Sequence, residues 1–312
     1  MRKKTIVIYL GSDCNLNCSY CHRERGDIEQ PITKDFLMKL ETFDGIIAFR
    51  GGEPTLYIDE IKKIVNIAKN ADFQITTNGI LLNKYIDFFK KYNFKVSLSY
   101  DGTNIRPYNP MTKYIDYPYI TTTNILSNKT DFNQILDNFD TTSLLCGHRI
   151  GLSFHLGHHT SNENKELYMT KKEYNILYEQ IKSALICFYL DYKNYYMLNY
   201  RYKHLYDSLR SRMLCNFKFG ETPCNNEYIK RVDSSGVRFT CSYIRDTKLN
   251  EDSWLEQQQN ILEKRNPSCK FCSVYNMCGG GCLKCISHKN ECFFYYKIFT
   301  WFRENYIDVY SH

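Results

Sequence analysis

The chain lacks any apolar run long enough to cross a bilayer. The longest such run, ALICFYL, has seven residues, whereas a membrane-spanning helix needs about 20. The early apolar stretch TIVIYL, of six residues, is shorter than the core of a secretory signal peptide. The sequence also has no block of Lys and Arg of the kind that binds nucleic acid. We therefore expect a cytoplasmic protein that binds neither a membrane nor nucleic acid.

Cysteine is what the chain has in excess, with 14 in 312 residues. In a small secreted protein these would indicate disulfides. Here the chain is long and its cysteines cluster at spacings typical of metal ligands, which favours a reducing compartment. Hydrophobic residues make up 43% of the chain, enough for one large α/β domain or one domain with an appended module. The formal net charge of +7 carries little weight, because metal-bound thiolates would offset it.

Strand-like and helix-like segments alternate over the first half of the chain. Strands are predicted at residues 6–10, 45–49, 73–77, 95–100 and 150–155. Helices are predicted at residues 34–42, 57–70, 81–92 and 131–138. This alternation predicts an α/β fold, a partial (β/α)6-type parallel barrel with outer helices. A long helical stretch follows at residues 171–212, and Ile186–Leu190 within it is the only candidate for a sixth strand.

Three cysteines, Cys14, Cys18 and Cys21, follow the first predicted strand with the spacing C-x3-C-x2-C. Three thiolates on so short a loop can hold three corners of a [4Fe–4S] cluster and leave the fourth iron open. The alternatives are a structural zinc site with a remote fourth ligand, or plain buried thiols. In a parallel barrel the loops after the strands converge on the functional site, so the neighbouring loops bear on this choice.

The loops after the next three strands carry GGEP (residues 51–54), TTNG (76–79) and SLSYDG (97–102). Together with the cysteine spacing, this order resembles the radical S-adenosylmethionine (SAM) superfamily over about residues 5–155. The resemblance implies that Cys14, Cys18 and Cys21 hold a catalytic [4Fe–4S] cluster whose open iron binds SAM. Reductive cleavage of SAM would then give a 5′-deoxyadenosyl radical that abstracts hydrogen from a substrate.

The same resemblance implies a set of SAM contacts. These are Tyr20, Gly51, Gly52, Glu53, Thr77, Asn78, Ser97, Ser99 and Asp101. Glu53 would accept a hydrogen bond from the SAM ammonium group. The residue that meets the SAM carboxylate is open between Arg106 and Arg149. His155, His158 and His159 are open between a catalytic base, a substrate contact and ordinary loop residues.

The C-terminal third holds a second cysteine series. It resembles the seven-cysteine SPASM module, with Cys224, Cys241, Cys269, Cys272, Cys278, Cys282 and Cys292. That module binds two auxiliary [4Fe–4S] clusters, which implies three clusters in total. By resemblance one cluster is held by Cys269, Cys272, Cys278 and Cys292. The other is held by Cys224, Cys241 and Cys282, completed by Cys215 or Cys285.

Other readings of the C-terminal region remain open. Two zinc sites are the alternative to auxiliary clusters. A hairpin is expected to turn at Ser234–Gly236, and the aromatic stretch FFYYKIFTWF (293–302) is expected to form a C-terminal helix. Cys146 and Cys187 are expected to be buried thiols.

These features predict a radical SAM barrel at residues 1–190, a helical bridge at 191–214 and a SPASM domain at 215–312. The expected function is maturation of a ribosomally synthesised peptide by cross-link, thioether, epimerisation or excision. One alternative is an anaerobic sulfatase-maturating enzyme that oxidises Ser or Cys to formylglycine. Another is a non-catalytic iron–sulfur electron carrier or a zinc scaffold.

The expected partners follow from that function. They are the peptide or protein substrate and an electron donor such as flavodoxin or ferredoxin. The chain begins at its first strand. We therefore expect a separate leader-peptide recognition protein, or direct docking on the barrel.

Overall fold

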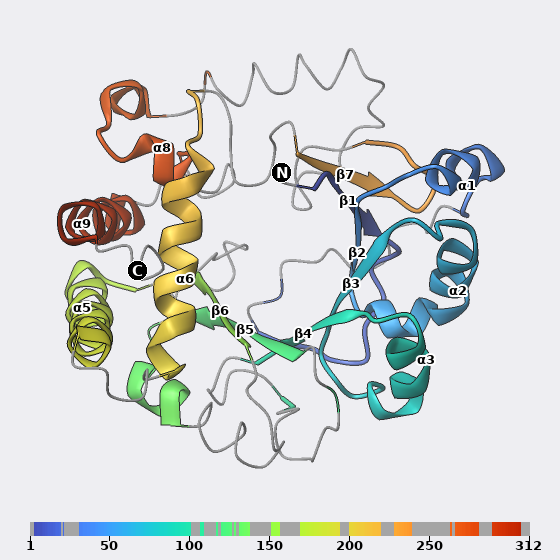
Figure 1. The fold of residues 1–312 in the computed structure, drawn as a ribbon, viewed down its shortest axis with the longest axis horizontal. Helices are drawn as coiled ribbons and strands as arrows, with labels where there is room; N and C mark the ends of the chain where they lie inside the picture. Colours follow the sequence, from blue (N-terminus) through green and yellow to red (C-terminus); the bar gives the residue numbers. More distant parts are fainter. Residues whose placement is uncertain are drawn as a thin grey trace.

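The fold is built on one parallel sheet of seven strands. The computed structural model describes residues 3–19, 21, 31–100, 107–108, 117, 120–126, 128, 131–137, 151–156, 169–193, 200–219, 228–238, 263, 266–280 and 289–306. Its strands are β1 (Thr5–Tyr9), β2 (Ile46–Arg50), β3 (Asp72–Thr77), β4 (Lys95–Ser99), β5 (Ile120–Leu126), β6 (Gly151–Leu156) and β7 (Ile229–Asp233). They follow the order β6-β5-β4-β3-β2-β1-β7. Figure 1 shows them around an arc, which confirms an α/β fold consistent with a partial barrel.

Three helices cover the outer side of the arc (Figure 1). These are α1 (Lys34–Glu41), α2 (Ile58–Ile67) and α3 (Ile86–Lys91), with short 3-10 turns η1 (Pro54–Tyr57) and η2 (Asn83–Tyr85) before the last two. The helix predicted at residues 81–92 is thus shorter than expected. Residues 132–137 are helical, close to the prediction.

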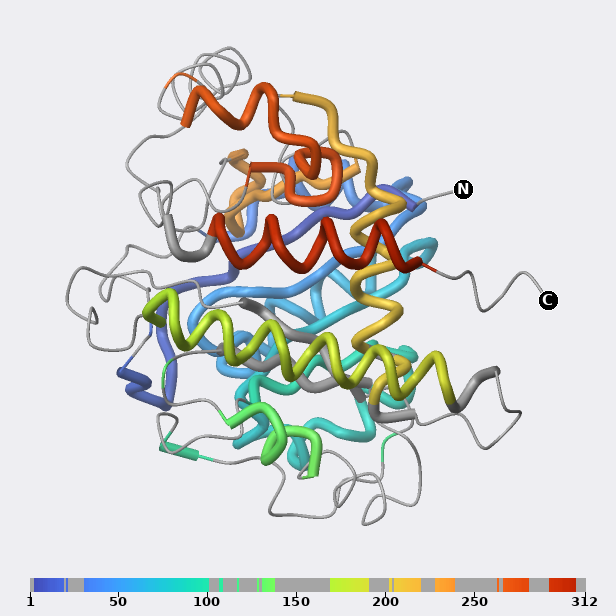
Figure 2. Tube along the Cα trace, turned by 90° about the vertical axis from the view of Figure 1, so that its left-hand side faces the viewer, coloured from blue at the N-terminus to red at the C-terminus, as the bar shows by residue number. Residues whose placement is uncertain are grey.

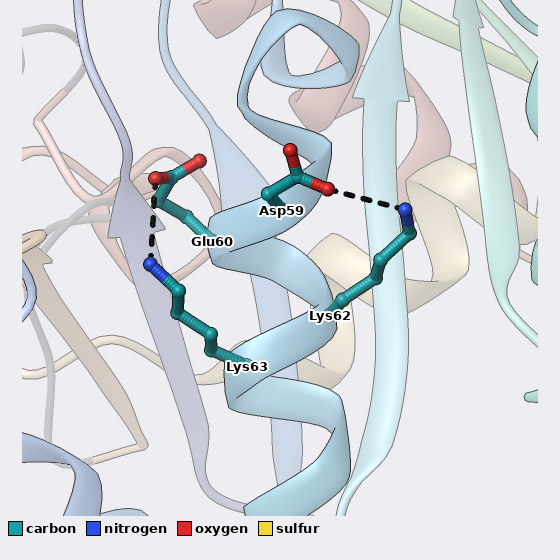
Figure 3. A network of polar contacts seen from close by, with 4 residues as sticks. All are labelled: Asp59, Glu60, Lys62 and Lys63. Carbon is teal, nitrogen blue, oxygen red and sulfur yellow. Dashed lines mark hydrogen bonds and ion pairs between the residues drawn. The ribbon is translucent and has the colours of Figure 1, made fainter.

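Helices α1 and α2 show why the sequence pattern placed them correctly. The Thr33 side chain accepts a hydrogen bond from the Phe36 N–H and caps the start of α1. In α2, Ile61, Ile64 and Val65 form one buried stripe. Its opposite face carries two exposed ion pairs, Asp59–Lys62 and Glu60–Lys63, which Figure 3 shows. Such pairs contribute less than about 1 kcal/mol each, so the buried stripe holds the helix in place.

The strands predicted from the sequence differ from the structure in two places. Strand β5 was missed, since its sequence ITTTNIL supplies β-propensity from three threonines but no hydrophobic alternation. Residues Ile186–Leu190 form no strand and lie inside α5 (Lys171–Lys193).

Strand β7 brings the C-terminal third of the chain into the barrel sheet. The predicted turn is confirmed: Asp233 N–H donates to the Val237 carbonyl at 3.0 Å and Gly236 has φ +88°. The first arm of the predicted hairpin, however, is β7, which pairs in parallel with β1. In the part of the chain that the structure describes, the second arm contributes one isolated bridge, Val232–Arg238. The division into three domains stays a prediction.

A group of helices lies beyond β6. It contains α5, α6 (Tyr200–Cys215) and α9 (Lys289–Asn305), and Figure 2 shows α9 running alongside α5. The predicted C-terminal aromatic helix is confirmed as α9. It packs through Phe294 on Tyr174 of α5 and through Phe302 on Tyr206 of α6, with ring centroids 5.4 and 5.8 Å apart.

None of the helices in the described ranges combines the length and apolar character that crossing a membrane requires.

Candidate functional site

The three cysteines of the C-x3-C-x2-C motif lie on the loop that leaves the carboxyl end of β1. Cys14, Cys18 and Cys21 are all half-buried, and none forms a disulfide. The Leu16 N–H lies 3.4 Å from the Cys14 Sγ. The Cys21 N–H donates to the Cys18 carbonyl at 3.1 Å, which closes a tight turn around the second and third cysteines. We call residues 11–21 the cysteine loop.

Two glycines after β2 let the next loop lie directly against the cysteine loop. The Gly52 N–H donates to the Gly11 carbonyl at 2.8 Å, and the Glu53 N–H donates to the Asp13 carbonyl at 2.7 Å. A Cβ on Gly52 would lie 2.1 Å from the Asp13 carbonyl oxygen, and Gly51 has φ +144°. Only glycine permits this approach. The glycines are therefore required by the seating of one loop on the other, whether or not they also meet SAM.

Glu53 is the centre of a buried hydrogen-bond network, with an exposed fraction of 1%. Its Oε1 accepts from the Thr55 N–H at 3.1 Å and from the Thr55 and Thr77 hydroxyls at 2.6 Å each. Its Oε2 accepts from the Asn78 N–H at 2.8 Å. The carboxylate thus ties the loop after β2 to the loop after β3. Its predicted contact with the SAM ammonium group stays a prediction.

Asn78 carries that network on to the cysteine loop. Its Nδ2 donates to the Asn15 Oδ1 at 2.7 Å and lies 3.7 Å from the Cys14 Sγ. N–H groups aimed at a cysteine sulfur stabilise the thiolate form that a cluster requires. On the other side, the Asp13 N–H donates to the Tyr57 hydroxyl at 3.0 Å. Sequence reasoning missed Asn15, Thr55 and Tyr57 as supporting residues, since none lies in a motif tied to SAM.

The remaining predicted SAM contacts are only partly placed. Ser97 and Ser99 are half-buried on β4, alternating with Val96 and Leu98 of the core. His155 lies on β6, opposite Ile125 of β5. Several predicted residues lie outside the described residues: Tyr20, Asp101, Arg106, Arg149, His158 and His159.

Four C-terminal cysteines lie near enough to interact electrostatically, with Cys278 at their centre. That they hold one cluster together stays a prediction. The pKa of Cys278 is raised to about 12, chiefly by burial and also by the neighbouring thiols of Cys292, Cys272 and Cys269, while a hydrogen bond from the Gly280 backbone lowers it. Cys269 lies in η5 (Pro267–Phe271) and Cys278 ends α8 (Tyr275–Cys278). Four thiols that repel each other when ionised suit a positively charged metal cluster, which stabilises thiolates. We call these four residues the C-terminal cysteine cluster.

Other cysteines are placed less completely. Cys215 ends α6, and the Phe217 N–H just after it donates to the carbonyl of Asn276 in α8 at 2.9 Å. Cys146, Cys224, Cys241, Cys282 and Cys285 lie outside the described residues. The expectation that Cys187 is buried is wrong: it is exposed on α5.

The cysteine loop offers three thiols of the kind that a [4Fe–4S] cluster takes as ligands. Within the described ranges, no three His, Cys, Asp or Glu side chains converge closely enough to hold one metal ion. A cubane cluster instead takes one thiolate at each corner, so its cysteines stand farther apart. Cys14, Cys18 and Cys21 would hold a cluster with one open iron at the carboxyl edge of β1. The four-residue set around Cys278 would fill all corners of another.

A cavity of about 600 Å³ lies away from this site, between α1 and the edge of the sheet. It is lined by residues such as Lys4, Phe36, Lys39 and Lys230. It adjoins the first residues of β1, at the opposite strand end from the cysteine loop. It is not the candidate active site.

Comparison with known proteins supports the resemblance to the radical SAM superfamily. The model of the Radical SAM superfamily matches residues 8–166, about half of the chain. The "Cysteine-type anaerobic sulfatase-maturating enzyme" of Clostridium novyi is 35% identical over 114 residues, covering 30% of this chain and 30% of that protein. The "Probable GTP 3',8-cyclase" of Methanocaldococcus jannaschii is 34% identical over 123 residues, covering 36% and 41%. The match thus spans less than half the length of these curated relatives.

Solved structures share the fold at low identity. The crystal structure of Streptococcus suis SuiB matches with a TM-score of 0.58 and 18% identity, covering 92% of this chain and 75% of that one. The structure of SuiB bound to S-adenosylmethionine matches with a TM-score of 0.56 and 17% identity, covering 92% and 73%. On the match of half its length, this chain belongs to the radical SAM superfamily and is a radical SAM enzyme.

Proposed function

We propose that this enzyme is a maturase that modifies a ribosomally synthesised peptide. The observation that supports this most is the C-terminal cysteine cluster, because it lies beyond the matched residues 8–166. Four thiols gathered there support an auxiliary [4Fe–4S] site of the SPASM type. The seven-cysteine spacing adds a second one, with Cys215 or Cys285 as its fourth ligand. Enzymes that resemble this arrangement mostly act on peptides.

The residues of the cysteine loop have a defined role in this proposal. A reduced [4Fe–4S] cluster with bound SAM supplies a 5′-deoxyadenosyl radical, which takes a hydrogen atom from the substrate. Cys14, Cys18 and Cys21 would hold that cluster. Gly51 and Gly52 seat the loop after β2 against residues 11–13, and the Asn78 side chain lies near the Cys14 sulfur. Auxiliary clusters held by the C-terminal cysteines would supply an electron acceptor for an oxidised product or an anchor for the substrate.

Anaerobic maturation of a sulfatase is the second candidate. The name of the Clostridium novyi relative supports it, since that protein matures a sulfatase. The relatives named as GTP cyclases are equally similar over a comparable segment, so this segment alone does not select a substrate. The non-catalytic alternatives, an electron carrier or a zinc scaffold, are set aside because the chain is a radical SAM enzyme.

The proposed partners follow from the chemistry. An electron donor such as flavodoxin or ferredoxin would reduce the clusters in the cytoplasm. A separate leader-peptide recognition protein, or direct docking on the barrel, would deliver the peptide.

The cluster content is tested on protein purified without oxygen. Iron and sulfide are quantified, and 5′-deoxyadenosine is measured after SAM and dithionite are added. We expect about 12 irons per chain, as three cubane clusters require. About 4 irons with zinc, accompanied by SAM cleavage, would contradict the auxiliary clusters while leaving the barrel assignment intact.

The substrate class is tested by co-expression. The enzyme is produced with short cysteine- or aromatic-rich reading frames from its own gene neighbourhood, and in parallel with any neighbouring sulfatase. Mass spectrometry of the purified partner is expected to show a mass change in the peptide that needs intact Cys14. A mass change confined to the sulfatase would instead support the second candidate.

A further inference from the structure

Arg50 is a half-buried cation with a buried Nη1 that the SAM assignment leaves unexplained. It is the last residue of β2, directly before Gly51. Ile47 and Phe49 of this strand belong to the core beneath the outer helices. Strand alternation therefore places Arg50 on the opposite side, which we call the inner face of the sheet. Its Nη1 is buried and has no hydrogen-bond partner in the described part of the chain.

A second guanidinium approaches it across β1. Register pairs Arg50 with Tyr9 of β1, and Val7 of the same strand with Arg231 of β7. Burial lowers the pKa of Arg50, the positive charge of Arg231 lowers it further, and Tyr9 acts in the opposite direction. A buried cation beside a second cation is costly unless an anion joins them. No ion pair involving Arg50 occurs among the described residues.

Thr76 lies at the neighbouring position on β3. Phe49 pairs with Ile75, so Arg50 and Thr76 are the next residues along two adjacent strands. The Thr76 Oγ1 is also buried and has no hydrogen-bond partner in the part of the chain that is described. Arg50 and Thr76 thus occupy neighbouring positions on the inner face, and the Arg50 Nη1 and the Thr76 Oγ1 both have unused hydrogen-bonding capacity. Buried polar atoms are seldom left without any hydrogen-bond partner, and a bound ligand is one group that supplies it.

Asp233, an acidic residue at the end of a neighbouring strand, is committed elsewhere. Asp233 ends β7 opposite Tyr9. Its Oδ1 accepts from the Ser235 N–H at 2.9 Å, the Ser235 hydroxyl at 2.7 Å and the Val237 N–H at 2.9 Å. It therefore holds its own turn.

We propose that Arg50 and Thr76 form a carboxylate-binding site on the inner face of the barrel, and that the peptide substrate places an acidic side chain or its C-terminal carboxylate there. Guanidinium groups bind carboxylates through two parallel hydrogen bonds. Arg231 adds positive charge from its position opposite Val7, two residues before Tyr9 in β1. The site therefore lies nearer the start of the strands than the Gly51–Gly52 segment does. This inference rests on the proposed function and narrows its substrate to peptides that can place a carboxylate at this site.

SAM also carries a carboxylate, so the test distinguishes a peptide carboxylate from the SAM carboxylate. The anaerobically reconstituted holoenzyme is saturated with SAM, and its melting temperature is measured with glutarate, with N-acetylglycine or with the neutral analogue glutaramide. Arg50→Met removes the cation with little change in volume, and Thr76→Val removes only the hydroxyl. Lys62→Met is the matched control, because Lys62 is exposed on α2 and pairs with Asp59 (Figure 3).

The expected result is a rise of the melting temperature by about 2 °C or more with either carboxylate, but not with glutaramide. Arg50→Met abolishes this rise and melts higher than wild type without ligand, because an uncompensated buried charge is gone. Thr76→Val reduces the rise, and Lys62→Met keeps it. SAM affinity, measured by equilibrium dialysis, stays within about threefold in Arg50→Met.

Two results would overturn the proposal. One is the absence of a carboxylate-dependent rise in the wild-type holoenzyme. The other is a loss of SAM affinity of tenfold or more in Arg50→Met, which would assign Arg50 to the SAM carboxylate. A different result would contradict only the proposed peptide-modifying function. If carboxylates stabilise the wild type but no peptide is modified on co-expression, the anion site stands and the proposed function does not.

Discussion

The cysteine loop and the C-terminal cysteine cluster present thiols in two different settings. The cysteine loop is tied to the loops after β2 and β3 by long-range hydrogen bonds, through Gly11, Asp13 and Asn15. The C-terminal cluster sits on short turns, where Cys272 N–H donates to Cys269 and Cys278 N–H donates to Val274. The first is held by hydrogen bonds from loops of neighbouring strands. The second has a thiol whose pKa burial raises, so its thiolate form would gain most from a bound metal.

Under the proposed function, that contrast is the one expected between a catalytic site and a structural one. A rigid, preorganised first site fixes the radical chemistry in space. The second can be assembled by its metal, as small metal-stapled modules are. Substitutions and metal removal should affect the two sites differently, and loss of a cluster ligand should have the largest effect.

Replacing Cys14 by Ala is expected to abolish 5′-deoxyadenosine formation, since the cluster loses a corner ligand that two N–H groups approach. The assay is anaerobic cleavage of SAM with dithionite. Cys187→Ala is the matched control, because this cysteine is exposed on α5 and outside both settings. Undiminished cleavage in Cys14→Ala would contradict the ligand assignment.

Removal of iron by an anaerobic chelator is expected to loosen the C-terminal cluster and leave the cysteine-loop framework in place. Hydrogen exchange reads both regions in one experiment. The amides of Gly52 and Glu53 should stay protected, because carbonyls of residues 11 and 13 accept from them. The amides of Cys272 and Cys278 should exchange much faster. Equal loss of protection in both regions would mean that the first site also depends on its metal.

Gly52→Ala is expected to damage the cysteine loop through the backbone alone. The added Cβ would meet the Asp13 carbonyl oxygen at 2.1 Å and force the two loops apart. We expect a loss of about 1–3 kcal/mol in the free energy of unfolding, measured by urea titration, together with weaker SAM binding. A variant as stable as the wild type would show that the loops separate without cost.

Thr77→Val is expected to have the smallest effect, because it removes one of four hydrogen bonds to Glu53. The loss should be about 1 kcal/mol of stability, since Glu53 keeps three donors. Glu53→Gln should cost more, as one carboxylate oxygen becomes an N–H2 group facing N–H or O–H donors. If instead Glu53→Gln leaves stability unchanged and only weakens SAM binding, the carboxylate serves SAM rather than the framework.

Much of the fold could be predicted from the sequence wherever a single local pattern determined the helix or strand. The stripe of Ile61, Ile64 and Val65 predicted α2, and Thr33 predicted the start of α1. Strand β5 escaped because its threonines carry no hydrophobic period. The strand wrongly predicted at Ile186–Leu190 is the opposite error, since a short apolar run is equally compatible with a strand and with a buried helix.

The sequence by itself determined the chemistry class, because cysteine spacing and the order of short motifs after successive strands are local patterns. Only the tertiary structure decided which groups meet. It joined β7 to β1 across more than 200 residues of chain. It turned the Glu53 carboxylate toward Thr55, Thr77 and Asn78, and it left Arg50 on the inner face without an acidic partner among the described residues. Such contacts depend on strand register and burial, which no local pattern encodes.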